Sequence, residues 1–186
     1  QRLSPATVAA VRTLDQMGIA VLLVTGRMFR SAADFAGRLG LGGPVVAYQG
    51  ALIREVSSGR VLHSDPVPMD LAREVLAMIE PLGLTINLYV DDELCVAARN
   101  ADVRRYEEIS HMKARVVGPL TTFLERPTTK IGVTGPPEVL DGLLGDVRDV
   151  FGHTLSALKT WPFFLELASP TATKARALQI LGDLMG

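Results

Sequence analysis

The chain has 186 residues, of which 48% are hydrophobic and 21% charged, a composition typical of globular proteins with one large domain or two small ones. The formal net charge of −1 argues against a nucleic-acid-binding surface, and no apolar run is long enough for a transmembrane helix. The single cysteine, Cys95, excludes an internal disulfide and is predicted to be buried as a small apolar residue. We therefore expect a cytoplasmic protein that binds neither nucleic acid nor membrane.

The first two predicted elements lead to a polar turn. Ser4-Pro5 is a typical helix start, with serine as the N-cap and proline in the first position. The apolar residues that follow recur at helical spacing and are expected to face a core: Val8, Val11, Leu14 and Met17. Gly18 then ends the helix, and the unbroken apolar run over 19–24 predicts a buried parallel strand. The carboxyl end of such a strand is where an open α/β sheet binds its ligand.

The triplet Thr25-Gly26-Arg27 follows that strand. A hydroxyl, a conformationally permissive glycine and a guanidinium suit an oxyanion, and phosphate is the simplest candidate. The alternative is structural: Thr25 caps the next helix, Gly26 makes the turn and Arg27 is a solvated first-turn residue. The triplet alone leaves both interpretations open.

A second polar loop follows the next predicted strand. A helix over 28–39 and a glycine-rich loop precede a buried strand over 44–48, which ends at Gln49-Gly50. Two consecutive strands joined by a helix predict a βαβ unit, in which both loops lie at the same edge of a parallel sheet. A β-hairpin over 51–63 completes this region.

The pattern changes near Pro66, because residues 65–162 alternate helices with hairpins in an α+β pattern. We therefore predict an α/β protein with a partial Rossmann-like parallel-sheet core, formed by residues 1–64 and 163–186, and an inserted α+β cap domain over 65–162. The chain returns to the core through a strand over 163–167 and a helix that Thr173 caps.

Lys174 lies in the first turn of that last helix, where a cation opposes the helix dipole. An anion bound at the helix N-terminus would stabilise a lysine at this position. A solvated lysine without a ligand is the alternative.

The order and spacing of these motifs resemble the haloacid dehalogenase-like (HAD) phosphatase superfamily, in its Cof-type branch with a large α/β cap inserted late in the core. The resemblance covers nearly the whole chain. It is carried by the following segments in order: the Ser4-Pro5-x-Thr7 helix start, Val24-Thr25-Gly26-Arg27, Tyr48-Gln49-Gly50-Ala51, and Leu165-Glu166-Leu167 seven residues before Lys174.

The resemblance implies two catalytic residues. Thr25 matches the threonine that hydrogen-bonds the transferring phosphoryl group, and Lys174 matches the lysine that neutralises phosphate and nucleophile charge. The residues that match the substrate-binding positions of the family are Gly26, Arg27, Gln49 and Gly50. Gln49 stands where the family usually has asparagine, and Ala175 where glycine is common.

The resemblance also implies a Mg²⁺-dependent phosphatase that hydrolyses a small phosphorylated metabolite, such as a sugar phosphate, through an aspartyl-phosphate. The family's Asp-x-Asp loop is expected just before Gln1 and its metal loop beyond Gly186. No metal ligand is therefore predicted among the 186 residues, and these residues alone are expected to be inactive. The alternative is a non-catalytic phosphate- or sugar-binding module on a degenerate scaffold. The oligomeric state is left open.

Other residues whose side chains could bind a metal or a substrate are interpreted as structural. The three histidines, which are not at metal-ligand spacing, are expected to be structural or exposed: His63, His111 and His153. Asp91-Asp92-Glu93 is interpreted as a solvated hairpin turn rather than a cation site. Trp161 is predicted to pack as a plug between cap and core, with a substrate platform as the alternative. Lys130 is a weaker candidate for a cap contact to substrate phosphate.

Overall fold

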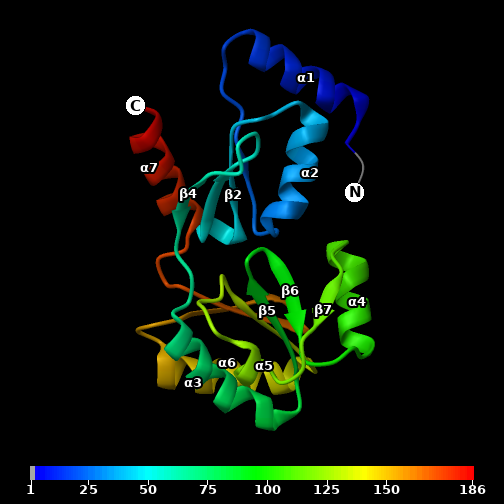
Figure 1. Ribbon diagram of the computed structural model, residues 1–186, viewed down its shortest axis with the longest axis vertical. Coiled ribbons are helices and arrows are strands. Elements are labelled where there is room, and N and C mark those ends of the chain that lie inside the picture. Colours follow the sequence, from blue (N-terminus) through cyan, green and yellow to red (C-terminus); the bar gives the residue numbers. More distant parts are fainter. Residues whose placement is uncertain (1–2) are drawn as a thin grey trace. The chain divides into compact units, whose positions relative to one another are not determined.

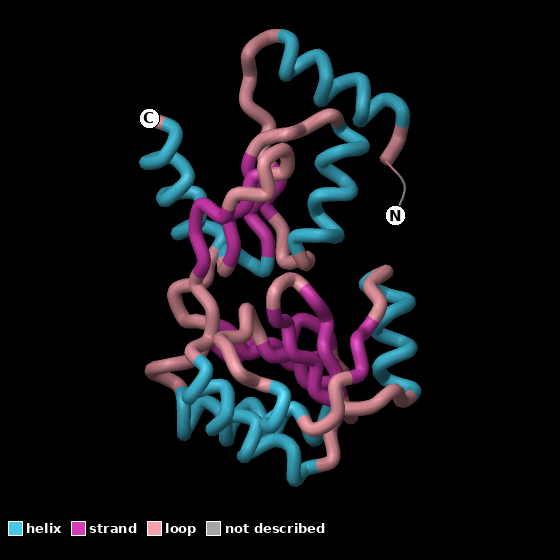
Figure 2. Tube along the Cα trace, viewed as in Figure 1, coloured by secondary structure: helices cyan, strands magenta, loops and turns pink. Residues whose placement is uncertain are grey.

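The computed structural model describes residues 3–186, apart from the side chain of Met185. The chain divides into two compact units, one formed by Gln1–Ser64 with Thr173–Gly186 and the other by Asp65–Ala172 (Figure 1). Helices accompany a sheet in each unit, which confirms the predicted α/β class (Figure 2). Among the described helices, none combines the length and the apolar character needed to span a bilayer.

The first unit contains a four-stranded sheet in the order β1-β2-β3-β4. Its elements are α1 (Pro5–Gln16), β1 (Leu23–Val24), α2 (Phe29–Leu39), β2 (Pro44–Ala47), the 3₁₀ turn η1 (Tyr48–Gly50), β3 (Leu52–Glu55), β4 (Val61–Ser64) and α7 (Lys174–Met185). Strands β1 and β2 are parallel, with Val24 opposite Val46, whereas the other two pairings are antiparallel. The predicted βαβ unit, β1-α2-β2, and the hairpin that follows it are therefore confirmed.

The beginning of the first unit differs from the prediction in two ways. The strand expected over 19–24 is only Leu23–Val24, and both residues are half-buried, so the prediction of a buried strand is wrong. Helix α1 has the expected cap, since Ser4 Oγ accepts a hydrogen bond from Thr7 N at 3.0 Å. However, α1 contains no buried residue, and Met17 is 67% exposed. On the predicted apolar side of α1, which contacts α2, Val8 and Val11 are half-buried, whereas Leu14 is exposed.

The core of the first unit joins helix α7 to the middle of the sheet. Its buried cluster comprises residues of β2, β3 and α7: Val46, Ile53, Ala177 and Leu181. This packing fixes the start of α7 relative to the strands, which matters for the candidate site. Helix α2 buries one face through residues spaced by a helical period: Phe29, Ala32, Ala36 and Leu39.

The second unit contains a six-stranded mixed sheet in the order β7-β6-β5-β8-β10-β9. Its elements are α3 (Met69–Ile79), the 3₁₀ turn η2 (Glu80–Leu82), β5 (Thr85–Val90), β6 (Glu93–Val96), α4 (Ala101–Ser110), β7 (Ala114–Val116), α5 (Leu120–Phe123), β8 (Ile131–Thr134), α6 (Pro137–Phe151), β9 (Ser156–Trp161) and β10 (Phe164–Ala168). Only β6 and β7 pair in parallel.

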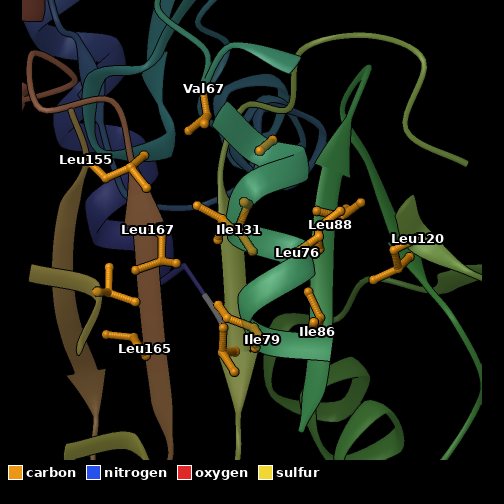
Figure 3. Close-up of a cluster of buried hydrophobic side chains, with 14 of the residues drawn as sticks. Val67, Leu76, Ile79, Ile86, Leu88, Leu120, Ile131, Leu155, Leu165 and Leu167 are labelled. Atoms are coloured by element: carbon orange, nitrogen blue, oxygen red, sulfur yellow. The ribbon is translucent and has the colours of Figure 1, made fainter. Parts of the chain in front are cut away.

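One face of this sheet forms the apolar core of the second unit. Alternate residues of the three central strands contribute to the buried cluster: Ile86, Leu88, Ile131, Val133, Leu165 and Leu167. Residues of α3 and α6 belong to the same cluster, so both helices cover that face (Figure 3). The strand period of two therefore sends the intervening residues to the opposite face.

The return of the chain to the first unit lies at Thr173, so the predicted boundary at residue 163 is wrong. Strand β10 is hydrogen-bonded between β8 and β9, which places it in the second unit. The two ends of the second unit are linked, because Thr171 Oγ1 donates a hydrogen bond to Asp65 Oδ2 at 2.6 Å.

Candidate functional site

Two loops of the first unit are held together by backbone hydrogen bonds at the carboxyl ends of β1 and β2. Gln49 N donates to Thr25 O at 3.1 Å, and Tyr48 N donates to Arg27 O at 2.9 Å. Because parallel strands end at the same edge of a sheet, the loops after β1 and β2 meet there. The structure thus brings the predicted residues 25–27 and 49–50 together.

Gly26 lies directly beneath the side chain of Gln49. A Cβ atom on residue 26 would lie 2.4 Å from Gln49 Nε2 and 2.7 Å from Gln49 Cδ. Any larger residue at position 26 would therefore displace the carboxamide. The longer side chain of Gln49, compared with the asparagine usual in the family, extends back over the turn after β1.

Gly50 brings the second loop against the start of α7. Its φ of +117° is unfavourable for residues with a side chain, and a Cβ atom there would lie 2.3 Å from the backbone oxygen of Thr173. Only glycine permits this close approach. The start of α7, which carries Lys174, therefore lies against the loop after β2, although it is far away in the sequence.

The loop after β2 also holds two non-glycine residues in the left-handed region, Tyr48 with φ +51° and Gln49 with φ +59°. This conformation costs roughly 1–2 kcal/mol per residue. The hydrogen bonds to Thr25 and Arg27 keep the loop in this conformation. Backbone strain of this kind concentrates at functional sites. The sequence contained no signal for it, because neither residue is glycine.

Thr25 does not cap the next helix. Helix α2 begins after Met28, without a side-chain cap, and Thr25 Oγ1 instead accepts from Arg27 N at 3.2 Å. Its hydroxyl hydrogen remains available to donate. The Arg27 guanidinium lies 3.3 Å from Ser31 Oγ and 5.5 Å from the ring centre of Phe35, two contacts that hold it along α2.

Lys174 is exposed, and its ammonium group has no hydrogen-bond or ion-pair partner within the part of the chain that the structure describes. Thr173 caps α7 as predicted, because its Oγ1 accepts from Arg176 N at 3.2 Å. An unpaired cation at a helix N-terminus lies in a positive electrostatic environment. An anion bound there would interact favourably with both the ammonium and the helix dipole.

The described residues contain no group of three or more histidine, cysteine, aspartate or glutamate side chains that could hold a metal ion. They therefore do not fit Mg²⁺ by themselves, since this ion prefers carboxylate and other oxygen ligands. The chemistry that these residues do offer is oxyanion binding, through a hydroxyl donor, two close-packed glycine turns and a cation.

Lys130 in the second unit is more deeply buried than expected for a ligand of substrate phosphate. The Lys130 ammonium lies 2.8 Å from Glu166 Oε1 and over the ring of Tyr89, and its side chain is 5% exposed. It is therefore part of a buried ion pair rather than an exposed phosphate ligand. Trp161 stacks on Phe163 within the second unit and is 41% exposed, so its packing between cap and core stays a prediction.

The remaining structural interpretations agree with the structure except at Asp92, which is buried although the turn was predicted to be solvated. Cys95 is buried, and this burial raises the pKa of its thiol, so the sulfur stays protonated and inert. Asp91 lies in the hairpin turn and pairs with Arg126 at 2.7 Å. The three histidines are exposed or half-buried: His63, His111 and His153.

Comparison with known proteins identifies relatives of this chain. A family model described as haloacid dehalogenase-like hydrolase matches residues 1–186. A "putative phosphatase" of Streptococcus pyogenes serotype M6 is 21% identical over 194 residues, covering 100% of this chain and 71% of that protein. A "putative phosphatase" of Haemophilus influenzae is 25% identical over 178 residues, covering 94% of this chain and 65% of that protein.

The fold is also known from crystallography. A protein of Thermotoga maritima superposes with a TM-score of 0.91 at 25% identity, over 99% of this chain and 69% of that chain. This chain thus spans about two thirds of the length of the proteins that it resembles. The family model extends over all 186 residues and includes the loops that converge on Lys174. The chain belongs to the haloacid dehalogenase-like hydrolases.

Proposed function

We propose that the protein is a phosphatase that hydrolyses phosphoric monoesters of small metabolites. The observation that carries this proposal is the convergence of three chain segments in the first unit. The Thr25-Gly26 turn, the Gln49-Gly50 loop and the start of α7, which carries Lys174, lie together at the end of a parallel strand pair. The family assignment and the phosphatase names of the relatives support it.

Each residue has a distinct part in this proposal. The Thr25 hydroxyl donates to a phosphoryl oxygen, since its own oxygen already accepts from Arg27 N. The Lys174 ammonium offsets the negative charge that grows on the phosphoryl group and on its attacking and leaving oxygens. Gly26 makes room for the Gln49 side chain and Gly50 for the Thr173 backbone, so the two glycines bring the three segments together. Arg27 and the Gln49 carboxamide contact the remainder of the substrate.

We further propose that the first unit is the catalytic core and the second unit a cap that closes over the substrate and excludes water. The reaction passes through an aspartyl-phosphate, and the carboxylates and the Mg²⁺ ligands come from outside residues 1–186. The single reduced thiol, Cys95, supports a cytoplasmic location.

The alternative is a non-catalytic phosphate- or sugar-binding module. It is favoured by one observation, the lack of a carboxylate cluster among the described residues. The full reading frame separates the two candidates. An Asp-x-Asp loop before Gln1 and a Gly-Asp-x-x-Asn-Asp loop after Gly186 exclude the binding module, and the absence of both excludes the phosphatase.

The proposal is tested by Lys174→Ala in the full-length protein. We expect turnover of p-nitrophenyl phosphate with Mg²⁺ to fall by about 10²–10³-fold, the usual effect of losing one preorganised charge-stabilising group. Arg176→Ala is the matched control, because Arg176 is an exposed cation in the same helical turn, and it should stay within about threefold of the unmodified enzyme. Near-normal turnover by Lys174→Ala would contradict the role of Lys174.

A further inference from the structure

The backbone of Arg27 is fixed from both sides at the edge of the first unit's sheet. Its N–H donates to Thr25 Oγ1 at 3.2 Å, and its carbonyl oxygen accepts from Tyr48 N at 2.9 Å. These bonds tie Arg27 to the loops after β1 and β2, but they do not set the direction of its side chain. A free arginine side chain has many rotamers, so the place of the guanidinium depends on the groups that it contacts.

Two side chains of α2 contact the Arg27 guanidinium. Arg27 Nη1 donates to Ser31 Oγ at 3.3 Å, and the guanidinium carbon lies over the Phe35 ring, 5.5 Å from its centre. A hydrogen bond of this length is weak, whereas a guanidinium within about 6 Å of a ring centre makes a favourable cation–π contact. The ring is therefore the stronger of these two contacts. All three residues belong to the first unit, and each is half-buried.

The spacing on α2 explains why Ser31 and Phe35 meet the same guanidinium. They are four residues apart, so they lie one turn apart on the same side of the helix. Helical side chains lean toward the N-terminus, so the Phe35 ring covers the turn that contains Ser31. Arg27 lies just before the helix start, within reach of this turn. The neighbouring residues Ala32 and Ala36 are buried, which fixes the helix that carries the two contacts.

We propose that Phe35, assisted by Ser31, is a positioning residue that holds the Arg27 guanidinium ready for the substrate. This inference rests on the proposed phosphatase function, in which Arg27 contacts the substrate beyond its phosphoryl group. A preordered arginine loses less side-chain freedom when the substrate binds, so the substrate binds more tightly. Phe35 itself does not touch the substrate, and it acts only through Arg27.

The test is a double-mutant cycle in the full-length protein, with p-nitrophenyl phosphate and Mg²⁺. Phe35→Leu keeps an apolar side chain but removes the aromatic face. It should raise KM about two- to tenfold and change kcat by less than about twofold. Arg27→Ala should raise KM about 10–100-fold, because it removes a charged donor to the substrate. In the Arg27→Ala background, Phe35→Leu should raise KM by less than about 1.5-fold, since the group that it positions is gone.

Three further variants separate positioning from a general effect on the fold. Phe35→Tyr keeps the ring and should keep KM within about twofold of the unmodified enzyme. Ser31→Ala removes only the weak hydrogen bond and should raise KM about twofold. Arg38→Ala is the matched control, because Arg38 is a second cation near the ring, 5.3 Å from its centre, that pairs with Asp34 rather than with the site. This control should leave KM unchanged.

Four results would overturn the positioning role. An equal rise in KM from Phe35→Leu with and without Arg27 means that the ring supports the fold rather than Arg27. A rise for Phe35→Tyr as large as that for Phe35→Leu contradicts the cation–π contact. An unchanged KM for Arg27→Ala excludes the contact between Arg27 and the substrate, but it leaves the phosphatase proposal intact. An unmodified enzyme that does not hydrolyse p-nitrophenyl phosphate overturns the phosphatase proposal and this inference with it.

Discussion

The second unit buries one face of its sheet under two helices, whereas helix α1 of the first unit buries none of its residues. In the second unit, α3 and α6 cover the same face of the sheet, on which Leu88, Ile131 and Leu167 are fully buried. In the first unit, Met17 on the α1 side and Leu184 on α7 are 67% and 57% exposed.

This contrast indicates that the second unit contributes mainly to stability, whereas the first unit positions polar side chains. The second unit is built around one continuous apolar cluster, which is the main source of folding free energy. In the first unit, the closest contacts are made at two glycine turns and at a loop with a strained backbone. These contacts position polar groups. Functional sites commonly depart from the rules that stabilise the rest of a fold.

The largest expected effect tests the stabilising role of the second unit's core. Ile131→Ala removes a fully buried side chain from the centre of the sheet and should lower the free energy of unfolding by about 2–5 kcal/mol in urea titrations. Leu14→Ala on α1 is the matched control in the first unit. Leu14 is already 37% exposed, so this change should stay within about 0.5 kcal/mol. If the two changes lowered the free energy of unfolding equally, the proposed difference between the units would be wrong.

The next effect concerns the close contact in the first unit. Gly50→Ala places a Cβ against the Thr173 backbone at a positive φ, so it should cost about 2–3 kcal/mol and lower turnover of p-nitrophenyl phosphate in the full-length protein. Gly18→Ala is the control, because Gly18 also has a positive φ, +73°, but no atom within 4 Å of the added Cβ. It should cost about 1 kcal/mol and leave turnover unchanged. Similar effects on turnover would exclude a specific role for the Gly50 contact.

The smallest effect concerns acid sensitivity of the second unit. Glu107 accepts a hydrogen bond from Ala114 N at 2.8 Å and pairs with Arg99 and Lys113. The backbone hydrogen bond, with help from Arg99, holds the pKa of the Glu107 carboxyl below its usual range. The stabilisation is therefore present above the ordinary carboxyl pKa of about 4.3 and is lost as the pH falls through the lower folded-state value.

Unfolding titrations between pH 3 and pH 7 test this prediction. The stability difference between the unmodified protein and Glu107→Gln should be largest at neutral pH and shrink in acid. Glu108→Gln, at the exposed neighbouring position, should show no such pH dependence. Parallel pH curves for the unmodified protein and Glu107→Gln would contradict the assignment.

Local sequence patterns predicted the parts of the fold that depend on local chemistry. Apolar runs and the glycines after them predicted the βαβ unit, and parallel pairing explains why Thr25 and Gln49 meet. The pattern of Ser4-Pro5 predicted the α1 cap. The role of Lys174 required the family resemblance as well, since a lysine in a first helical turn is by itself ambiguous.

Features that depend on contacts between segments far apart in the sequence could not be predicted from local patterns. The apolar strand over 164–168 fits either sheet, and only its pairing with β8 and β9 assigns it to the second unit. The helical spacing of Leu14 and Met17 shows which face of α1 is apolar but not whether another element covers it. The left-handed conformation of Tyr48 and Gln49 depends on the neighbouring loop, which no local pattern encodes.

The hydrogen bond between Thr171 and Asp65 has a consequence for protein engineering. It joins the first and last segments of the second unit, so this unit is a natural module for exchange between related enzymes. A chimaera should take residues 65–172 as one piece. It should leave Thr173 in the recipient, because that residue both contacts Gly50 and caps the helix that presents Lys174. A graft that ends one residue later would carry foreign backbone into the Gly50 contact, so the effect of the exchanged unit could not be separated from damage to that contact.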